Sequence, residues 1–275
     1  MKFLSPTERL YLAGGIERGI RSDGRARDQF RPDTLSIDCI PQANGSARIQ
    51  VQRGCDILIG IRLDLGTPAL ETPNKGRIIC NVDCSTSTAL NEIENRPFRE
   101  INTFIAQTLT KLVENSLDLA DLCILTGHHC WLLYVDVLVL EFNGNLLSCA
   151  MKALKAALKS LKIPQVSVSP IELEADQKEA SEFALEVDED NCRQLNMDSF
   201  PTLFTFNLVA VADGGSEVWF VDGTMQEELS AREQVLVAID AGGRIYSVEN
   251  LGRGALSPDS LVCLLESAKA FATTL

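Results

Sequence analysis

Residues 131–161 read WLLYVDVLVLEFNGNLLSCAMKALKAALKSL, and this stretch decides the fold. The part from Trp131 to Phe142 is apolar apart from two acidic residues, which indicates a strand in the middle of a sheet. Gly144 then turns the chain, and apolar residues at helical spacing predict a helix from about Leu146 to Leu161. Loops between such elements often carry catalytic groups, yet residues 143–150, NGNLLSCA, include no charged side chain.

The start of the chain has a clear helix signal. Ser5 and Glu8 are spaced as a capping box, with Pro6 at the first helical position. We therefore predict a helix from Pro6 to about Arg18, followed by an arginine-rich loop.

Alternating apolar residues after this loop predict a sheet. Strands are expected at 34–40, 46–52 and 55–65, with Asn44-Gly45 as the turn of the first hairpin. A fourth strand is expected at 77–84, and a helix with one apolar face at 97–115. Together with the central strand and its helix, these elements form an N-terminal lobe.

The last third of the chain repeats this plan of strands followed by a helix. Strands are predicted at 203–212, 217–221, 234–241 and 244–248, and an amphipathic helix begins at Ser257-Pro258. The fold class is therefore α+β, with an N-terminal lobe at 1–168, an acidic connection at 169–192 and a C-terminal lobe at 193–275.

Charge is distributed unevenly. The net charge is −13, but residues 171–190 alone carry nine acidic side chains against one lysine, so we interpret them as a solvated connection. The first 31 residues carry seven basic side chains against four acidic ones, so a basic face is compatible with the acidic total. No apolar run approaches the ~20 residues of a membrane span, which favours a soluble intracellular protein.

The cysteine pattern favours reduced thiols rather than disulfides or a metal site. Nine cysteines form no CxxC pair, and most lie in apolar runs. The adjacent His128, His129 and Cys130 point to different faces of a strand, and no second cluster completes a metal shell. No metal and no cofactor are expected.

Five segments resemble the RNase PH family. These are IRSDGRARDQFRP at 20–32, NGSARIQVQRGCDILIGI at 44–61, LGTPALETPNKG at 65–76, HHCWLLYVDVLVLE at 128–141 and VDGTMQEE at 221–228. They occur in family order over nearly the whole chain, and within the family they look most like a ring subunit of the eukaryotic RNA exosome.

The resemblance implies an RNase PH fold of two lobes, each a mixed or antiparallel sheet packed with helices. It also implies a ring of six related subunits around a channel for single-stranded RNA, joined by cap subunits with RNA-binding domains and by associated exoribonucleases. The expected location is the nucleus, including the nucleolus, and the cytoplasm.

The same resemblance locates the position of the family's catalytic site, where this chain lacks the phosphate-binding side chains of active relatives. Phosphorolysis brings phosphate against a phosphodiester, so the site must neutralise concentrated negative charge. Active relatives carry Ser or Thr and then Arg at the helix start, where this chain has Leu146 and Leu147. Asp222 and Glu228 resemble the acidic pair of active relatives. The alternative interpretation is that Asp222 caps a turn and Glu228 is a solvated helix residue.

Basic residues supply the RNA-binding candidates. Arg96 and Arg99 precede or begin the 97–115 helix, where some relatives contact RNA, although both are equally compatible with exposed surface arginines. A row of lysines at 152, 155, 159 and 162 is typical of a water-facing helix side. The arginines at 21, 25, 27 and 31 could contact RNA or a neighbouring protein, or brace Asp23 and Asp28.

These observations favour a non-catalytic structural subunit of the exosome core ring. One alternative is an active phosphate-dependent 3′-5′ exoribonuclease whose phosphate is held by other arginines or by a neighbour. The other is a stand-alone RNA-binding module.

Overall fold

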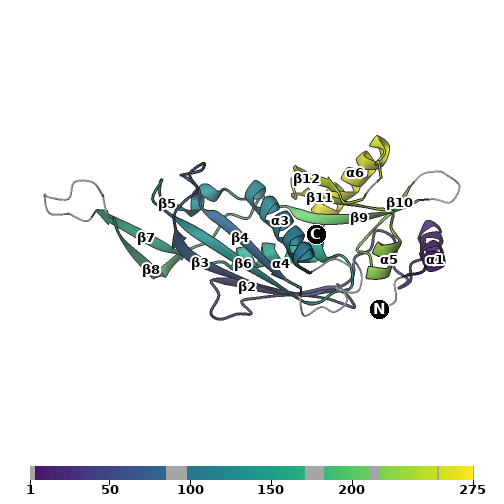
Figure 1. The fold of residues 1–275 in the computed structure, drawn as a ribbon, viewed down its shortest axis with the longest axis horizontal. Coiled ribbons are helices and arrows are strands. Elements are labelled where there is room, and N and C mark those ends of the chain that lie inside the picture. The colour runs from purple at the N-terminus through teal and green to yellow at the C-terminus, as the bar shows by residue number, and fades with distance from the viewer. Residues whose placement is uncertain (1–3, 85–97, 171–182, 211–216, 253, 275) are drawn as a thin grey trace.

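The computed structural model describes residues 4–84, 98–170, 183–210, 217–252 and 254–274. Its larger sheet has the strand order β1-β2-β3-β6-β4, with β5 also pairing with β6 (Figure 1). All neighbours are antiparallel except β4 and β6, which are parallel. The strands are β1 (Asp33–Ile37), β2 (Gly45–Val51), β3 (Asp56–Gly66), β4 (Arg77–Asp83), β5 (Cys123–Leu125) and β6 (His129–Glu141).

The central strand predicted from the sequence is β6, between β3 and β4. Its buried side chains alternate, and those of Leu133, Val135, Val137 and Val139 are all at most 2% exposed. The short helical turn η1 (Leu119–Leu122) and strand β5, which were not predicted, precede it. Three- and four-residue elements are too short to show a period in the sequence.

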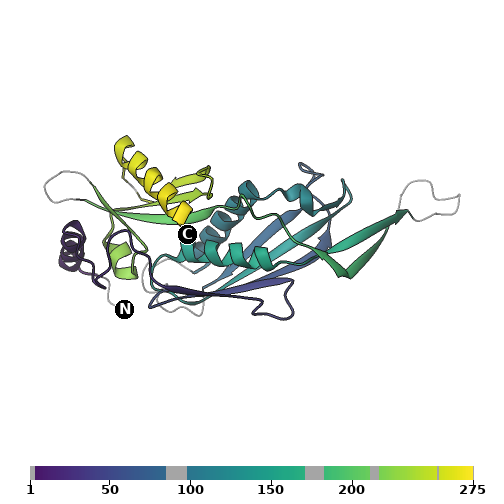
Figure 2. The same cartoon turned by 180° about the vertical axis from the view of Figure 1, so that it is seen from behind.

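In the described part of the chain, two helices cover one face of this sheet. Helix α3 (Phe98–Ser116) packs on β4, and helix α4 (Leu146–Ser160) packs on β2 and β3. Both agree with the predicted helices. Along α4 the apolar side is almost fully buried, which reflects its position between the two sheets (Figure 2).

The predicted Asn44-Gly45 turn is wrong in its detail. The loop between β1 and β2 spans residues 38–44, so it is longer than a two-residue turn. Gly45 instead permits close packing, because a Cβ there would lie 2.7 Å from the Ala157 carbonyl oxygen of α4. The glycine of the Asn44-Gly45 dipeptide is therefore explained by close packing against α4 and not by a two-residue turn.

The second sheet has the strand order β10-β9-β11-β12, entirely antiparallel. Helix α6 (Pro258–Thr274) buries Leu264 and Ala268 on one face of it, whereas Leu203 and Leu236 join the core beneath α4. The strands are β9 (Thr202–Val209), β10 (Val218–Val221), β11 (Glu233–Ile239) and β12 (Ile245–Asn250). All four strands were predicted, with shorter bounds for β9; helix α5 (Met225–Ser230) was not predicted as an element.

The N-terminal helix α1 (Pro6–Glu17) has the predicted capping box, in which Ser5 Oγ accepts the Glu8 N–H and the Glu8 carboxylate accepts the Ser5 N–H. It lies against α5, β9 and β10. Although the sequence assigned this helix to the N-terminal lobe, its contacts are with the C-terminal sheet. The chain therefore begins on one lobe and crosses to the other at residues 27–33.

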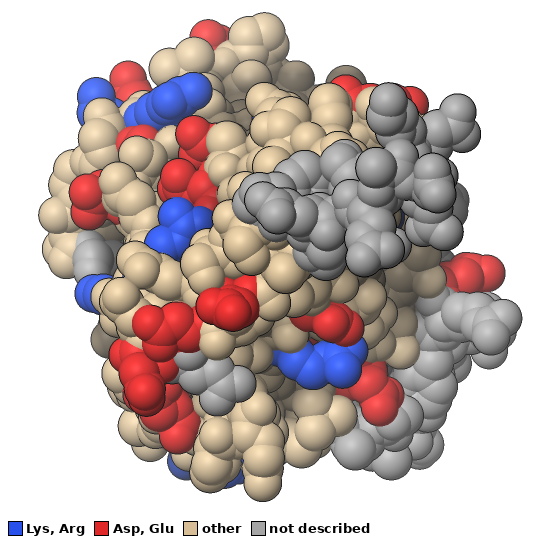
Figure 3. All heavy atoms as spheres, turned by 90° about the vertical axis from the view of Figure 1, so that its left-hand side faces the viewer, with Lys and Arg blue, Asp and Glu red and all other residues tan. Residues whose placement is uncertain are grey.

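The acidic connection includes regular structure, contrary to the prediction of a solvated linker. Strands β7 (Ile163–Pro170) and β8 (Phe183–Arg193) form an antiparallel hairpin that projects from the body (Figure 1). Residues 171–182 lie outside the described residues. Acidic side chains outnumber basic ones in the view from this end (Figure 3). Glu186 and Asp188 alternate with Leu185 and Val187, a strand period that the high charge density obscured.

None of the nine cysteines forms a disulfide. Cys55, Cys84 and Cys149 are buried, as expected for apolar runs, but Cys39 is exposed, contrary to that expectation. No helix in the described ranges is long and apolar enough to cross a membrane.

Candidate functional site

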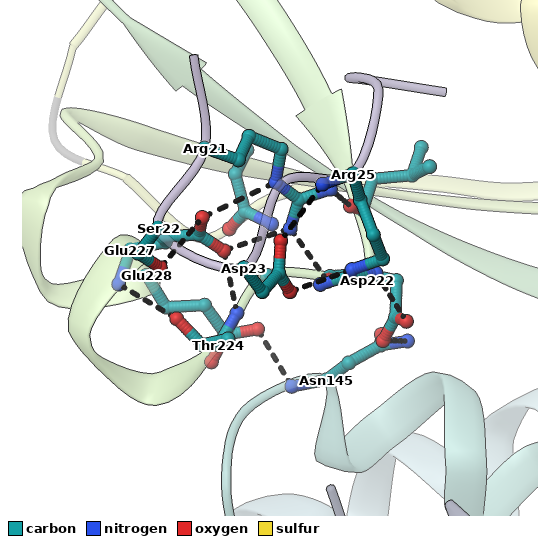
Figure 4. Close-up of polar contacts among 12 residues, drawn as sticks. Arg21, Ser22, Asp23, Arg25, Asn145, Asp222, Thr224, Glu227 and Glu228 are labelled. Carbon is teal, nitrogen blue, oxygen red and sulfur yellow. Dashed lines mark hydrogen bonds and ion pairs between the residues drawn. The ribbon is translucent and has the colours of Figure 1, made fainter. Parts of the chain in front are cut away.

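The candidate site is the loop between β6 and α4, which the second lobe holds in place. Gly144 has a φ of 81°, and Asn145 has a φ of 57°. A Cβ at Gly144 would lie 2.2 Å from the Gly223 carbonyl oxygen, so the backbones of two lobes meet at this point. The start of α4 is therefore positioned directly against residues 222–225 (Figure 4).

Leu146 and Leu147 occupy the first turn of α4, as predicted, and both are only 9% exposed. They belong to the main hydrophobic core and line a cavity of about 310 Å³ that also contains Glu100, Phe104 and Glu228. Neither leucine offers charge or a hydrogen-bond donor from its side chain. The wall that they contribute to the cavity is apolar.

Asp222 lies beside this loop as part of a buried ion-pair cluster. Arg31 binds it with two nitrogens, at 3.0 Å from Nε to Oδ2 and 2.7 Å from Nη2 to Oδ1, and Arg25 Nη1 lies 2.9 Å from Oδ2. Asn145 Nδ2 donates to Oδ1 at 2.9 Å. Burial acts to raise the pKa of Asp222, but the hydrogen bonds and charge of Arg31 outweigh it, so this pKa lies below its usual value.

A second buried pair lies next to the first. Arg21 Nη2 is 2.7 Å from the Glu227 carboxylate, and both side chains are at most 1% exposed. Glu227 also caps α5 by accepting the Thr224 N–H at 2.9 Å. Arg21 extends to the carbonyl oxygen of Asp222 at 2.9 Å, which joins the two pairs into one network (Figure 4).

Glu228, the second predicted carboxylate, points the other way, into the cavity lined by the leucines. Its Oε1 accepts the Asn145 N–H at 2.7 Å, as Figure 4 shows. Burial raises the pKa of Glu228 to about 8, despite this hydrogen bond. The carboxyl group is therefore mostly protonated at neutral pH, and the alternative of a solvated helix residue does not describe it.

Replacing Glu228 by glutamine is expected to stabilise the protein at high pH only. The folded pKa of about 8 lies above the unfolded value of 4.5, so wild-type stability falls as pH rises between these values. At about 1.4 kcal/mol per pKa unit, and with part of the shift relieved by local relaxation, Glu228→Gln should gain about 1 to 3 kcal/mol.

Urea unfolding at pH 5 and pH 8.5 measures this difference. Glu266→Gln on α6 is the matched control, because that side chain is exposed on a helix. An equal effect of Glu228→Gln at both pH values would contradict the protonated carboxyl group.

The two acidic residues thus lie beside the β6–α4 loop, near the leucines, but they do not form a carboxylate pair facing one space. Asp222 is neutralised by arginines, and Glu228 is enclosed separately. Among the residues that the structure describes, no group of three or more His, Cys, Asp or Glu could hold a metal ion.

The predicted RNA-binding arginines stay predictions. Arg96 lies outside the described residues, and Arg99 lies in the first turn of α3. The arginines of the loop after α1 already have partners within the chain. Arg27 lies 5.0 Å from the ring centre of Trp219, and the other three, Arg21, Arg25 and Arg31, bind carboxylates. In the lysine row, Lys155 Nζ donates to the Phe200 carbonyl oxygen, and Lys152 pairs with Asp33.

The sequence pointed to the arginines of the network and to the pairing of Arg25 with Asp23, but not to their partners in the second lobe or to Asn145. Arg31, Asn145 and Glu227 bind across sequence distances that no local pattern reveals. The available signal was Glu227 at the third position after Thr224, which forms a capping box with a buried glutamate.

Comparisons with known proteins identify the family. Residues 29–164 match the model of RNase PH, the 3′ exoribonuclease family, domain 1. The exosome complex component Rrp42 of Methanocella arvoryzae is 30% identical over 274 residues, covering 99% of this chain and 95% of that protein. The exosome complex component rrp42 of Schizosaccharomyces pombe is 29% identical, covering 94% of this chain and 88% of that protein.

Solved structures share the fold. A structure titled as the Archaeoglobus fulgidus exosome with RNA bound to the active site has a TM-score of 0.73 at 23% identity, covering 97% of this chain and 95% of that one. This likeness confirms the predicted RNase PH fold. With relatives matched along almost their full length, this chain belongs to the RNase PH family.

Proposed function

We propose that this chain is a catalytically silent structural subunit of an exosome core, where it completes a six-membered ring of RNase PH-type subunits. Its relatives are named as exosome components, which supports the assembly role. In the same proposal, cap subunits and exoribonucleases bind the ring, and single-stranded RNA passes through its channel. The proposed location in the nucleus, nucleolus and cytoplasm rests on the family resemblance alone.

The proposal that this chain is catalytically silent rests on the pair of leucines at the start of α4. Phosphorolysis needs donors or positive charge where negative charge concentrates, and Leu146 and Leu147 provide neither. Arg31, which donates to the Asn143 carbonyl oxygen of this loop, is already bound to Asp222 through Nε and Nη2. Removing one such donor typically lowers turnover about 100- to 1000-fold, so the absence of two should abolish measurable catalysis.

An RNA degradation assay tests this proposal. The purified protein is incubated with phosphate, Mg²⁺ and end-labelled single-stranded RNA, beside an active phosphorolytic ribonuclease as the positive control. We expect no nucleoside diphosphate above background. Release of nucleoside diphosphates by this chain alone would contradict the silent state and favour the exoribonuclease alternative.

The assembly role has its own measurement. Size-exclusion chromatography of the protein with co-expressed RNase PH-type subunits from the same source should show a larger complex that contains this chain. A protein that stays monomeric beside these subunits and binds RNA tightly would favour the stand-alone RNA-binding module.

A further inference from the structure

We propose that the outer edge of β1, together with the apolar groove beside it, is a docking site for an extended segment of a partner protein. The segment adds to β1 as a further strand of the first sheet. This inference rests on the proposed role as an assembly subunit, and it names the surface on which a neighbour binds.

The backbone of β1 has an open edge. β1 is the last strand of its sheet, and all five of its residues are exposed. The Gln52 N–H donates to the Pro32 carbonyl oxygen, and the Asp38 N–H donates to the Ser46 carbonyl oxygen. Because backbone groups alternate in direction along an antiparallel strand, those of residues 33, 35 and 37 point away from β2. An edge of this kind is a template for strand addition.

Apolar side chains accompany this edge. Leu35 and Ile37 are 41% and 59% exposed. They pair in register with Ile49 and Ala47 of β2, which are buried on the face that α4 covers. Leu35 and Ile37 therefore point to the same face, but α4 lies mainly over β2 and β3 and leaves them partly uncovered. An added strand would bury both.

A cavity continues this apolar strip at the start of β1. It has a volume of about 250 Å³ and is lined by residues from both lobes, half of them apolar, including Val51 and Phe204. Asn145 lines it as well; its Nδ2 donates to Asp222, and its Oδ1 is buried without a hydrogen-bond partner among the described residues. A buried acceptor without a donor is unfavourable. The cavity suits a partner side chain with an apolar body and one donor, such as tyrosine or tryptophan.

Charge beside the groove indicates the character of the partner. Helix α4 runs alongside β1, because Lys152 pairs with Asp33 at one end and Ser160 Oγ accepts the Ser46 N–H near the other. Lys152 and Lys159 are exposed and lie two turns apart on the same side of the helix. These lysines favour a segment with acidic side chains next to its apolar ones. A protein strand fits this surface better than RNA, since Leu35 and Ile37 offer no aromatic platform for bases.

Amide hydrogen exchange tests the docking directly on the wild-type protein. Exchange at residues 33–37 is measured for the chain alone and in a complex with its RNase PH-type partner subunits. We expect strong slowing at residues 35 and 37 in the complex. Slowing of the same amides by single-stranded RNA alone, without partner subunits, would overturn the proposal.

A double variant and a matched control provide a second test of the docking site. The double variant Leu35→Lys, Ile37→Lys places charge on the open edge and should weaken partner binding by at least about tenfold, without unfolding the chain, because both side chains are exposed. Val248→Lys is the matched control: Val248 is 40% exposed on β12, the edge strand of the other sheet. It should bind partners as the wild type does.

The outcomes distinguish failure of the docking site from failure of the assembly role. If the wild type assembles but residues 33–37 exchange as in the free chain, or the double variant assembles normally, the docking site is wrong and the assembly role stands. If the wild type itself forms no complex, the assembly role fails together with the site.

Discussion

Replacing Arg31 by methionine is expected to lower the free energy of unfolding by about 3 to 5 kcal/mol, the usual cost of breaking a buried ion pair from one side. Arg31 is 7% exposed and Asp222 3% exposed, so the carboxylate would lose its bidentate partner without gaining water, and only Arg25 and Asn145 would still bind it. Arg31 also donates to the carbonyl oxygens of Asn143 and Gly223, at 2.8 Å and 3.2 Å. Its loss would therefore loosen the junction of three chain segments.

Chemical denaturation at pH 7 measures this loss, with Arg48→Met as the matched control. Arg48 binds Asp56 at the same distance of 2.7 Å, but its side chain is 40% exposed, so its loss should be below about 1 kcal/mol. The double variant Arg31→Met, Asp222→Asn should be less destabilised than the sum of the two single variants, because the carboxylate that Arg31 neutralises is removed together with it. Equal losses for Arg31→Met and Arg48→Met would show that burial does not set the strength of this pair.

Replacing Gly144 by alanine is expected to have the second large effect, a loss of about 3 kcal/mol or more. The φ of 81° alone costs about 1 to 2 kcal/mol for a residue with a Cβ. The new Cβ would also lie 2.2 Å from the Gly223 carbonyl oxygen and 2.7 Å from the Thr224 carbonyl carbon. Backbone atoms cannot rotate away as a side chain can, so the two lobes must separate locally.

Gly127→Ala separates the two causes. Gly127 has a φ of 79°, yet a Cβ there would meet no atom within 4 Å. This control should therefore lose only the conformational part, about 1 to 2 kcal/mol. Thermal unfolding of both variants measures the comparison, and an equally small shift at Gly144 would mean that the lobes do not meet there as closely as described.

Most of the fold could be predicted from periodic patterns. The central strand β6, the helix α4 and the strands β9, β11 and β12 of the second sheet each span enough residues for a period of 2 or 3.6 to be visible. The hairpin of β7 and β8 was missed because acidic residues hide its alternation. The place of α1 on the second lobe could not be predicted, since the elements that it contacts lie more than 180 residues away in the sequence.

The candidate site was predicted less completely. The family resemblance led to Leu146, Leu147, Asp222 and Glu228, and the structure gathers these residues around one loop. The direction of each carboxylate could not be inferred from spacing. Asp222 has a φ of 47°, a backbone state that turns its side chain toward the arginines while Glu228 on α5 faces the cavity.

The clasp of Arg21, Arg25 and Arg31 around residues 222–227 has a consequence for biosynthesis. Arg31 and Asp222 are separated by 191 positions, so the opening residues leave the ribosome long before their counterions exist. Until then three guanidinium groups and helix α1 have no docking surface, and the nascent polypeptide holds them in an unfinished state. Maturation of the arginine loop and of α1 therefore waits until residues 222–227 have been synthesised.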